Sequence, residues 1–405
     1  MISHIYENVP YYRSIFEKQG LKPEDIKDAD SLYKIPFLTK KIIRKNLNDL
    51  KSKNYPDYKF DYITTGGTTG IPLGLYAEKG KWIANEYAFS KVMLDMTNCN
   101  LKNKVVILRS VILPKANEGK IWQYSMFRRC LILSSFHMSG KNLPIYIKRI
   151  RKFKPKFITT YPSIITVIAR YMEKNNIKSF PTLEAIYLGA ETIYDWQKKL
   201  LEKTFQCRLI TTYGHAERGA LACICEKSEK YHFFPEYGII EIIGKNGKIV
   251  NKENEEGEIV VTGFTNDIFP LIRYKTGDIG VYTKEKCICN RNYPLLKKIK
   301  GRTQDYIITI NNKLVSISVL NTHTDVFDNT EQFQYYQDKK GELILKLIKS
   351  KSYTEHDTEK IKKYLNEKLG EDFNIVIKFV EKISRTQRGK HNYLIQKLPV
   401  NNETS

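Results

Sequence analysis

The strongest constraint on the fold of this chain is a regular alternation of short apolar runs with helical segments in its middle part. The apolar runs lie at residues 105–108, 157–160, 185–188 and 208–211. Between them, residues 143–153, 163–174 and 194–204 carry apolar side chains at helical spacing. Strands that alternate with helices pair in parallel and are covered by those helices, so the pattern predicts an α/β fold with a layered core.

The length and the change of pattern along the chain predict two domains. The 405 residues exceed one ordinary domain. After residue 230, two strand-like segments at 237–243 and 257–264 flank a polar turn, which predicts a β-hairpin. Strand-like segments at 343–348 and 374–380 then enclose a helical one at 354–369. We therefore expect a large layered N-terminal domain of mixed sheets and helices at residues 1–302 and a small α+β C-terminal domain at residues 303–405.

The formal net charge of +23 suits nucleic acid, an anionic membrane surface or a polyanionic small molecule as a partner. Because the lysines are dispersed, a bias in codon usage is the simpler explanation. Dispersed positive charge could still attract ATP, coenzyme A or a nucleotide sugar.

The sequence also predicts a compartment. It contains no apolar run of about 18 residues, and its start lacks the basic and apolar regions of a signal peptide. Its seven scattered cysteines do not form a secreted disulfide framework. We expect a cytoplasmic protein with reduced thiols and no membrane span.

One segment rich in glycine and threonine is the most distinctive chemical motif. It consists of Thr64, Thr65, Gly66, Gly67, Thr68, Thr69 and Gly70. Glycine lets the backbone turn its N–H groups toward an anion, and threonine hydroxyls add donors, so the segment suits a triphosphate. No lysine follows Gly70 where the common Gly-x-x-x-x-Gly-Lys-Ser/Thr loop needs one. A polar hairpin turn is the alternative interpretation.

Two further motifs carry groups that can contact a nucleotide. Residues 211–217 follow a predicted strand, and ligands of α/β sheets bind at such strand ends. There, Tyr213 could stack on a base and Glu217 could hold Mg²⁺. Asp278 follows a glycine in a turn and could accept hydrogen bonds from both hydroxyls of a ribose. An ordinary strand-end loop and a capped turn are the alternatives.

The last two motifs are basic. Residues 301–305 contain Arg302, and residues 384–390 end in Lys390. A lysine on a loop next to glycine could reach a phosphate as a mobile point charge. Each segment could equally be a solvated part of the surface.

In this order, the five motifs resemble those of the acyl-adenylate-forming superfamily, which includes acyl-CoA synthetases, luciferases and the adenylation domains of peptide synthetases. The sequence is most similar to the phenylacetate–CoA ligase branch and, within it, to relatives in capsular polysaccharide biosynthesis. Further points of resemblance lie at residues 10–13, 35–40, 133–137, 161–163 and 189–191. The resemblance covers nearly the whole chain.

The resemblance implies roles for individual residues at the nucleotide. It implies that residues 64–70 wrap the ATP phosphates, that Glu217 binds Mg²⁺, and that Lys390 bridges the substrate carboxylate and the α-phosphate. The remaining implied contacts lie around the adenine and the ribose: Gly189, Ala190, Glu191, Tyr213, Gly214, Asp278 and Arg302.

The resemblance also implies an acyl pocket and a hinge. His137 and Tyr161 fall where the family lines its acyl pocket, although His137 could simply be a buried histidine. The small domain of this superfamily rotates between the two half-reactions, about a hinge that here lies near Gln304, where many relatives carry aspartate. Such a rotation would bring Lys390 to the site.

Together these roles imply an ATP-dependent adenylate-forming ligase that uses Mg²⁺. Its acceptor is either coenzyme A or an amine or hydroxyl on a sugar or carrier. The capsule-like resemblance favours surface polysaccharide biosynthesis, and an aryl- or acyl-CoA ligase of the phenylacetate type is the alternative. A catalytically inactive nucleotide-binding protein and a basic surface-binding protein are alternatives of another class. We expect no nucleic-acid partner; the carboxylic acid and the oligomeric state, monomer or homodimer, stay open.

Four soft ligands suggest a second kind of site. Cys225, His232, Cys287 and Cys289 form a Cys₃His set of the type that Zn²⁺ favours, and Cys223 competes with Cys225 for one place. Related ligases resemble this pattern, sometimes with structural zinc. With four protein ligands the site would be structural. Two pairs of ordinary buried thiols are the alternative.

Overall fold

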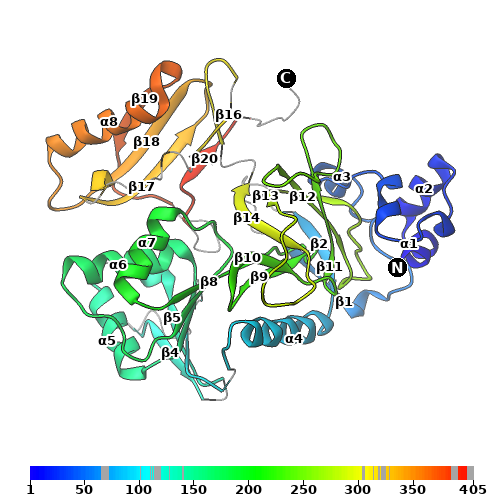
Figure 1. Cartoon of the computed structure of the whole chain (residues 1–405), viewed down its shortest axis with the longest axis horizontal. Helices are drawn as coiled ribbons and strands as arrows, with labels where there is room; N and C mark the ends of the chain where they lie inside the picture. Colours follow the sequence, from blue (N-terminus) through cyan, green and yellow to red (C-terminus); the bar gives the residue numbers. More distant parts are fainter. Residues whose placement is uncertain are drawn as a thin grey trace. The chain divides into compact units, whose positions relative to one another are not determined.

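The computed structural model in Figure 1 divides into two compact units. The first unit comprises residues 1–101 and 210–300, and the second comprises residues 102–209 and 301–405. The structure describes residues 1–64, 73–100, 102–109, 111, 113, 120–126, 128–138, 141–302, 306–312, 314–317, 320, 325–327, 329–384 and 391–398.

The first unit begins with short helices. They are α1 (Ile2–Asn8), α2 (Pro10–Gln19) and α3 (Lys40–Lys45). Pro10 begins α2, where its fixed φ suits the first helical position, and Gly20 ends it with a φ of 64°. Tyr12 anchors α2, because its buried hydroxyl donates to the Pro270 carbonyl oxygen at 2.9 Å and accepts from the Ile272 amide at 3.0 Å.

An antiparallel sheet forms the body of the first unit. Its strands run in the order β11-β12-β13-β14-β10-β9-β8. Their bounds are β8 (Arg208–Gly214), β9 (Leu221–Cys225), β10 (Ser228–Phe233), β11 (Gly238–Ile243), β12 (Glu256–Gly263), β13 (Tyr274–Tyr282) and β14 (Leu295–Arg302). The pair β11 and β12 confirms the predicted hairpin. The unit also contains the hairpin of β1 (Phe60–Thr64) and β2 (Gly74–Glu78), and the helix α4 (Lys81–Met96).

A buried ion pair ties the N-terminal segment to this sheet. Arg273 donates to both carboxylate oxygens of Glu241, at 2.9 and 2.8 Å, and to the carbonyl oxygens of Tyr33 and Ile35. Leu38 then pairs with β13, donating to the Arg273 carbonyl oxygen and accepting from the Lys275 amide. The segment that leads into α3 is therefore fixed at the start of β13.

The second unit contains the predicted parallel sheet. Its strands run in the order β7-β6-β3-β5-β4, with β4 antiparallel at the edge and the others parallel. They are β3 (Val105–Arg109), β4 (Trp122–Ser125), β5 (Cys130–Ser134), β6 (Phe157–Thr160) and β7 (Ala185–Leu188). The helices α5 (Leu143–Phe153), α6 (Pro162–Lys174) and α7 (Asp195–Phe205) pack their apolar faces into one core with these strands, and Figure 1 shows α6 and α7 side by side.

The C-terminal part of the second unit is a small α+β structure, as predicted. A four-stranded sheet runs in the order β19-β18-β17-β20, made of β17 (Thr330–Gln337), β18 (Glu342–Lys349), β19 (Asn374–Phe379) and β20 (Leu394–Gln396). The helix α8 (Glu355–Leu369) lies along it, and Thr354 and Asp357 form a capping box at its start. A hairpin of β15 (Tyr306–Ile308) and β16 (Leu314–Ser316) precedes the sheet. The boundary after residue 302 stays a prediction.

Within the described residues, no helix has both the length and the apolar character needed to cross a bilayer.

Candidate active site and a Cys/His cluster

The loop of residues 215–219, called the Glu217 loop here, follows the end of β8 in the first unit. Glu217 is buried, and its Oε1 accepts a hydrogen bond from the Tyr274 hydroxyl at 3.0 Å. Its Oε2 lies 3.3 Å from His215 Nδ1. Arg218 turns the chain with a φ of 57°. The sequence therefore places Glu217 at the predicted strand end, and His215 of the same loop and Tyr274 of β13 contact its carboxylate.

The surroundings of Glu217 keep its carboxylate charged. Burial would by itself raise the pKa of Glu217, but the contact with His215, the charge of His215 and the charge of Lys40 outweigh burial and lower that pKa to about 2. A buried carboxylate that stays ionised at neutral pH is suited to bind a cation such as Mg²⁺.

His215 is a site residue that sequence reasoning missed. Its side chain is only 5% exposed, and neither ring nitrogen has a hydrogen-bond partner among the described residues. The ring lies between those of Tyr213 and Tyr274, at centroid distances of 6.1 and 6.3 Å. A histidine two positions before Glu217 in the motif was the available signal, but its direction toward the carboxylate follows only from the fold.

Tyr213 and Asp278 come together from different strands. The Tyr213 hydroxyl donates to Asp278 Oδ2 at 2.8 Å. The Asp278 amide donates to Thr276 Oγ1 at 3.0 Å, and Thr276 donates to the Ile259 carbonyl oxygen at 2.7 Å. Asp278 therefore lies within strand β13 and not in the turn expected from the sequence. Both residues predicted to contact the nucleoside thus belong to one hydrogen-bonded group in the first unit.

Glycines of the β11–β12 hairpin let the Glu217 loop approach closely. A Cβ at Gly238 would overlap the carbonyl oxygens of Gly219 and Thr262, the latter at 2.7 Å. A Cβ at Gly263 would lie 3.0 Å from the Arg218 carbonyl oxygen and the Gly219 Cα. The backbone of the loop is therefore packed against the backbone of the hairpin, which leaves Glu217 little freedom.

In the second unit, Glu191 binds the start of α6. Its two carboxylate oxygens accept from the Ser163 amide at 2.9 Å and the Ser163 hydroxyl at 3.0 Å. Gly189 is buried, and Ala190 is exposed with a left-handed φ of 64°. A carboxylate at a helix N-terminus compensates the unpaired amides there. Glu191 thus holds the 189–191 segment against α6.

The two residues predicted for the acyl pocket lie in the second unit. Tyr161 is buried at the N-cap of α6, and the Arg109 guanidinium lies 5.1 Å from its ring centroid. Arg109 also donates to Thr159 Oγ1 at 3.1 Å. His137 ends the short 3₁₀ helix η5 (Ser135–His137), and its carbonyl oxygen accepts from Asn142. Their roles toward an acyl group stay predictions.

Several predicted site residues lie outside the described part of the chain. They are Thr65, Gly66, Gly67, Thr68, Thr69, Gly70, Gln304 and Lys390, together with the side chain of Arg302. Thr64 is the last residue of β1 and pairs with Gly74 of β2. The phosphate loop, the hinge and the catalytic lysine therefore stay predictions.

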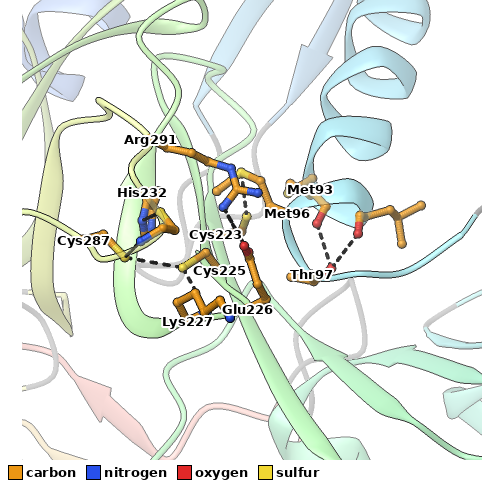
Figure 2. Close-up of polar contacts among 12 residues, drawn as sticks. Met93, Met96, Thr97, Cys223, Cys225, Glu226, Lys227, His232, Cys287 and Arg291 are labelled. Atoms are coloured by element: carbon orange, nitrogen blue, oxygen red, sulfur yellow. Dashed lines mark hydrogen bonds and ion pairs between the residues drawn. The ribbon is translucent and has the colours of Figure 1, made fainter.

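The four residues of the predicted zinc set do meet, in the first unit. One ligand atom each of Cys225, His232, Cys287 and Cys289 lies within 4.8 Å of the others, and we call this set the Cys/His cluster. The Cys225 and Cys287 sulfurs are 3.6 Å apart, and Cys289 Sγ lies 3.3 Å from His232 Nε2. Figure 2 shows Cys225 and Cys287 facing each other with His232 beside them.

The contacts of the two thiols decide between Cys223 and Cys225. Successive residues of a strand point to opposite faces, so Cys223 and Cys225, which are two positions apart, point to the same face of β9. Only their neighbours distinguish them. Cys225 faces Cys287, whereas Cys223 Sγ contacts Met96 Sδ at 3.9 Å (Figure 2). The cluster therefore uses Cys225.

Further polar contacts lie at and beside the Cys/His cluster. His232 Nδ1 lies 2.9 Å from the Lys230 carbonyl oxygen, which requires a proton on Nδ1 and leaves Nε2 as a ligand atom. Arg291 donates to both oxygens of Glu226, at 3.2 and 3.0 Å, beside the cluster (Figure 2).

Comparison with known proteins identifies the family. The model of the AMP-binding enzyme family matches residues 62–266, which is more than half of the chain, and the model of the CapK C-terminal domain matches residues 307–397. Protein CapK of Staphylococcus aureus is 28% identical over 98% of this chain and 87% of its own length. A phenylacetate–coenzyme A ligase of Thermus thermophilus is 24% identical over 76% of this chain and 69% of its own length.

Solved structures show the same fold. A 2-hydroxyisobutyryl-CoA ligase in the postadenylation state matches with a TM-score of 0.75 at 17% identity, over 98% of this chain and 87% of that one. The same ligase in the thioesterification state matches with a TM-score of 0.63 at 18% identity, over the same shares of the two chains. With the family models and the relatives, the chain belongs to the AMP-binding enzymes and is an adenylate-forming ligase of the branch that contains CapK and the phenylacetate–CoA ligases.

Proposed function

We propose that this ligase activates a carboxylic acid with MgATP at a site to which Glu217, Tyr213 and Asp278 contribute. The observation that carries the assignment is the buried Glu217 carboxylate, which contacts Tyr274 and His215 after the end of β8 and whose lowered pKa favours the ionised form. In this proposal Glu217 binds Mg²⁺, Asp278 accepts from the ribose hydroxyls, and the Tyr213 ring lies against the adenine.

The first half-reaction forms an acyl-adenylate. An oxygen of the substrate carboxylate attacks the α-phosphorus, an acyl O–P bond forms, and the bond from that phosphorus to the bridging oxygen breaks, so that pyrophosphate leaves. We propose that the positive charge of Lys390 stabilises the negative charge that develops between the carboxylate and the α-phosphate. Residues 64–70 and Arg302 complete the proposed nucleotide contacts.

In the second half-reaction a nucleophile of the acceptor attacks the acyl carbon, and AMP leaves. The 2-hydroxyisobutyryl-CoA ligase that shares the fold has been solved in postadenylation and thioesterification states, and we propose that this chain likewise uses one arrangement for each half-reaction. A hinge near Gln304 would serve this change.

For the acceptor we propose an amine or hydroxyl on a sugar or carrier of a surface polysaccharide pathway in the cytoplasm. The match to CapK extends over 98% of the chain and includes the C-terminal domain, whereas the match to the Thermus ligase extends over 76%. Coenzyme A is the second candidate acceptor, because the Thermus ligase and the 2-hydroxyisobutyryl-CoA ligase of the same fold are both named for it.

A carboxylate-dependent exchange of labelled pyrophosphate into ATP tests the adenylation step, with phenylacetate, benzoate and 2-hydroxyisobutyrate as first acids. We expect at least one acid of a broad panel to support exchange, and Lys390→Ala to abolish it while ATP binding persists. Lys382→Ala, at an exposed lysine nearby in sequence, is the matched control. Exchange with no acid at all, or full exchange by Lys390→Ala, contradicts the proposal.

The acceptor is tested separately, because the two half-reactions have different products. Once an acid is known, mass spectrometry of reactions with coenzyme A shows whether a thioester forms. Rapid thioester formation supports the coenzyme A alternative. Stable acyl-adenylate in the presence of coenzyme A, discharged by a nucleotide sugar or carrier, supports the polysaccharide pathway.

We also propose that the Cys/His cluster binds structural Zn²⁺. Zinc–sulfur bonds of about 2.3 Å in a tetrahedral site place two sulfurs about 3.8 Å apart. The Cys225–Cys287 separation of 3.6 Å is close to that value, and the orientation of His232 leaves Nε2 free to bind. With four protein ligands, zinc would join the loop after β13 to β9 and β10 and would have no open position for substrate.

A further inference from the structure

Tyr393 joins the C-terminal segment of the chain to α7 within the second unit. Its hydroxyl accepts a hydrogen bond from Gln197 Nε2 at 3.3 Å. Its ring meets the Tyr194 ring edge-on, at a centroid distance of 5.5 Å and an interplanar angle of 90°. Tyr194 itself belongs to the apolar core that is otherwise built from residues 307–394.

Gln197 is built into this contact. It is fully buried, and its Oε1 accepts from the Tyr194 amide at 3.1 Å. Its Nε2 donates to Thr166 Oγ1 at 3.2 Å as well as to Tyr393. Burying a side-chain amide costs free energy unless both of its N–H groups find acceptors. Thr166 of α6 supplies one acceptor for Gln197, and the Tyr393 hydroxyl supplies the second.

The same end of α6 holds Glu191. Ser163, which donates twice to Glu191, and Thr166, which contacts Gln197, are three residues apart on α6 and therefore lie on one face. One face of α6 thus carries two hydrogen-bonded groups, Ser163 with Glu191 of the 189–191 segment and Thr166 with Gln197 and Tyr393.

Tyr393 also contacts residues of the C-terminal part of the second unit. Its carbonyl oxygen accepts from the Tyr335 amide of β17 at 2.7 Å, and its ring packs against Phe333 and His391 at 5.3 and 4.5 Å. His391 in turn contacts the Phe333 carbonyl oxygen at 2.8 Å. Lys390, which lies outside the described residues, precedes Tyr393 by three positions in the sequence.

We propose that Tyr393 is a positioning residue for the adenylation half-reaction. Its contact with Gln197 and Tyr194 holds the chain that follows Lys390 beside the Glu191 end of α6, and the contact is released for acyl transfer. The proposal rests on the proposed function, in which Lys390 acts in the first half-reaction and the C-terminal part changes its arrangement for the second.

The test separates the two half-reactions in Tyr393→Phe, which removes only the hydroxyl, and in Tyr393→Ala, which also removes the ring. Pyrophosphate exchange with the acid that the wild type activates measures the first half-reaction. Transfer from the adenylate of that acid to the acceptor that the wild type uses, whether coenzyme A, a nucleotide sugar or a carrier, measures the second. We expect Tyr393→Phe to slow exchange about 3- to 10-fold, as for one hydrogen bond, and Tyr393→Ala to slow it further. Transfer should change less than about twofold.

Tyr364→Phe is the matched control, because the Tyr364 hydroxyl donates to the Leu320 carbonyl oxygen away from α7. This variant should leave both half-reactions unchanged. Equal losses in both half-reactions for Tyr393→Phe and Tyr393→Ala, or unchanged exchange in Tyr393→Ala, would overturn the proposal.

Hydrogen–deuterium exchange separates failure of this proposal from failure of the proposed function. If wild-type protein shows no pyrophosphate exchange with any acid, the proposed function fails. Peptides covering residues 194–198 and 391–396 should still lose protection in Tyr393→Ala and keep it in Tyr364→Phe. Unchanged protection in Tyr393→Ala would show that the contact holds nothing in place and would overturn the inference on its own.

Discussion

The Tyr213 hydroxyl donates a hydrogen bond of 2.8 Å to Asp278, although 65 positions separate the two residues in the chain. The bond joins the end of β8, which carries the Glu217 loop, to the middle of β13. It therefore couples the residue proposed to contact the adenine to the residue proposed to bind the ribose.

The first prediction concerns this bond. Tyr213→Phe keeps the ring but frees the Asp278 carboxylate to move, and a hydrogen bond to a charged group contributes about 1.5–3 kcal/mol. We expect the KM for ATP in pyrophosphate exchange to rise about tenfold, with a smaller change in kcat. Tyr282→Phe, in the same strand as Asp278, is the control. A KM for ATP that stays at the wild-type value would count against a role of this pair at the nucleoside.

The second prediction concerns the pH dependence of stability in metal-free protein. The pKa of Glu217 is lowered from 4.5 to about 2 in the folded protein, so the folded state favours the ionised form. The resulting stabilisation is complete above pH 4.5 and is lost as the pH falls toward 2, and the shift corresponds to on the order of 3 kcal/mol.

Glu217→Gln tests it, because glutamine does not titrate. Urea unfolding between pH 6 and pH 3.5 should show a steeper loss of unfolding free energy in the wild type than in Glu217→Gln. Parallel pH profiles for the two proteins would mean that His215 and Lys40 do not stabilise the charge of Glu217.

The sequence predicted elements of both units and missed short strands of both, for a physical reason. The helix at 143–153 and the strands at 157–160 and 185–188 have the predicted bounds, because apolar spacing reports directly on burial in a parallel α/β sheet. The strand β9 is buried along its whole length and short, so its residues show no alternation that would separate it from a loop or a helix.

The candidate site shows the same limit at the level of side chains. The motifs indicated Glu217, Tyr213 and Asp278, since local residue types suggest local chemistry. They did not indicate that Tyr274 bonds to Glu217 or that Arg273 pairs with Glu241, because these contacts depend on the pairing of distant strands. The identity of Cys225 rather than Cys223 as a cluster member was open for the same reason.

The third prediction concerns the contact of the Glu217 loop with its hairpin. A Cβ at Gly238 would overlap two backbone carbonyl oxygens, which cannot move as a flexible side chain can. We expect Gly238→Ala to destabilise the protein by about 2 kcal/mol or more and to lower exchange activity by displacing Glu217. Gly244→Ala, in the same hairpin, would meet first the Asn246 side chain, at 3.1 Å, and should cost much less. Thermal unfolding and pyrophosphate-exchange assays of both variants test this prediction. Equal effects of the two substitutions would contradict the role of close packing at Gly238.

The last prediction concerns metal at the Cys/His cluster. If zinc holds Cys225, His232, Cys287 and Cys289 together, its binding free energy adds to the stability of the folded state. Purified protein should then contain about one zinc ion per chain. A strong chelator should lower Tm, and Cys225→Ser should lose the metal and unfold at a lower temperature. Cys130→Ser, at a buried thiol of β5 outside the cluster, should keep the metal. Because the site would have no open position, activity should fall only as far as the fold is lost. A fully folded, zinc-free sample with wild-type Tm would rule out a structural zinc and leave the four side chains as a cluster of three thiols around a histidine.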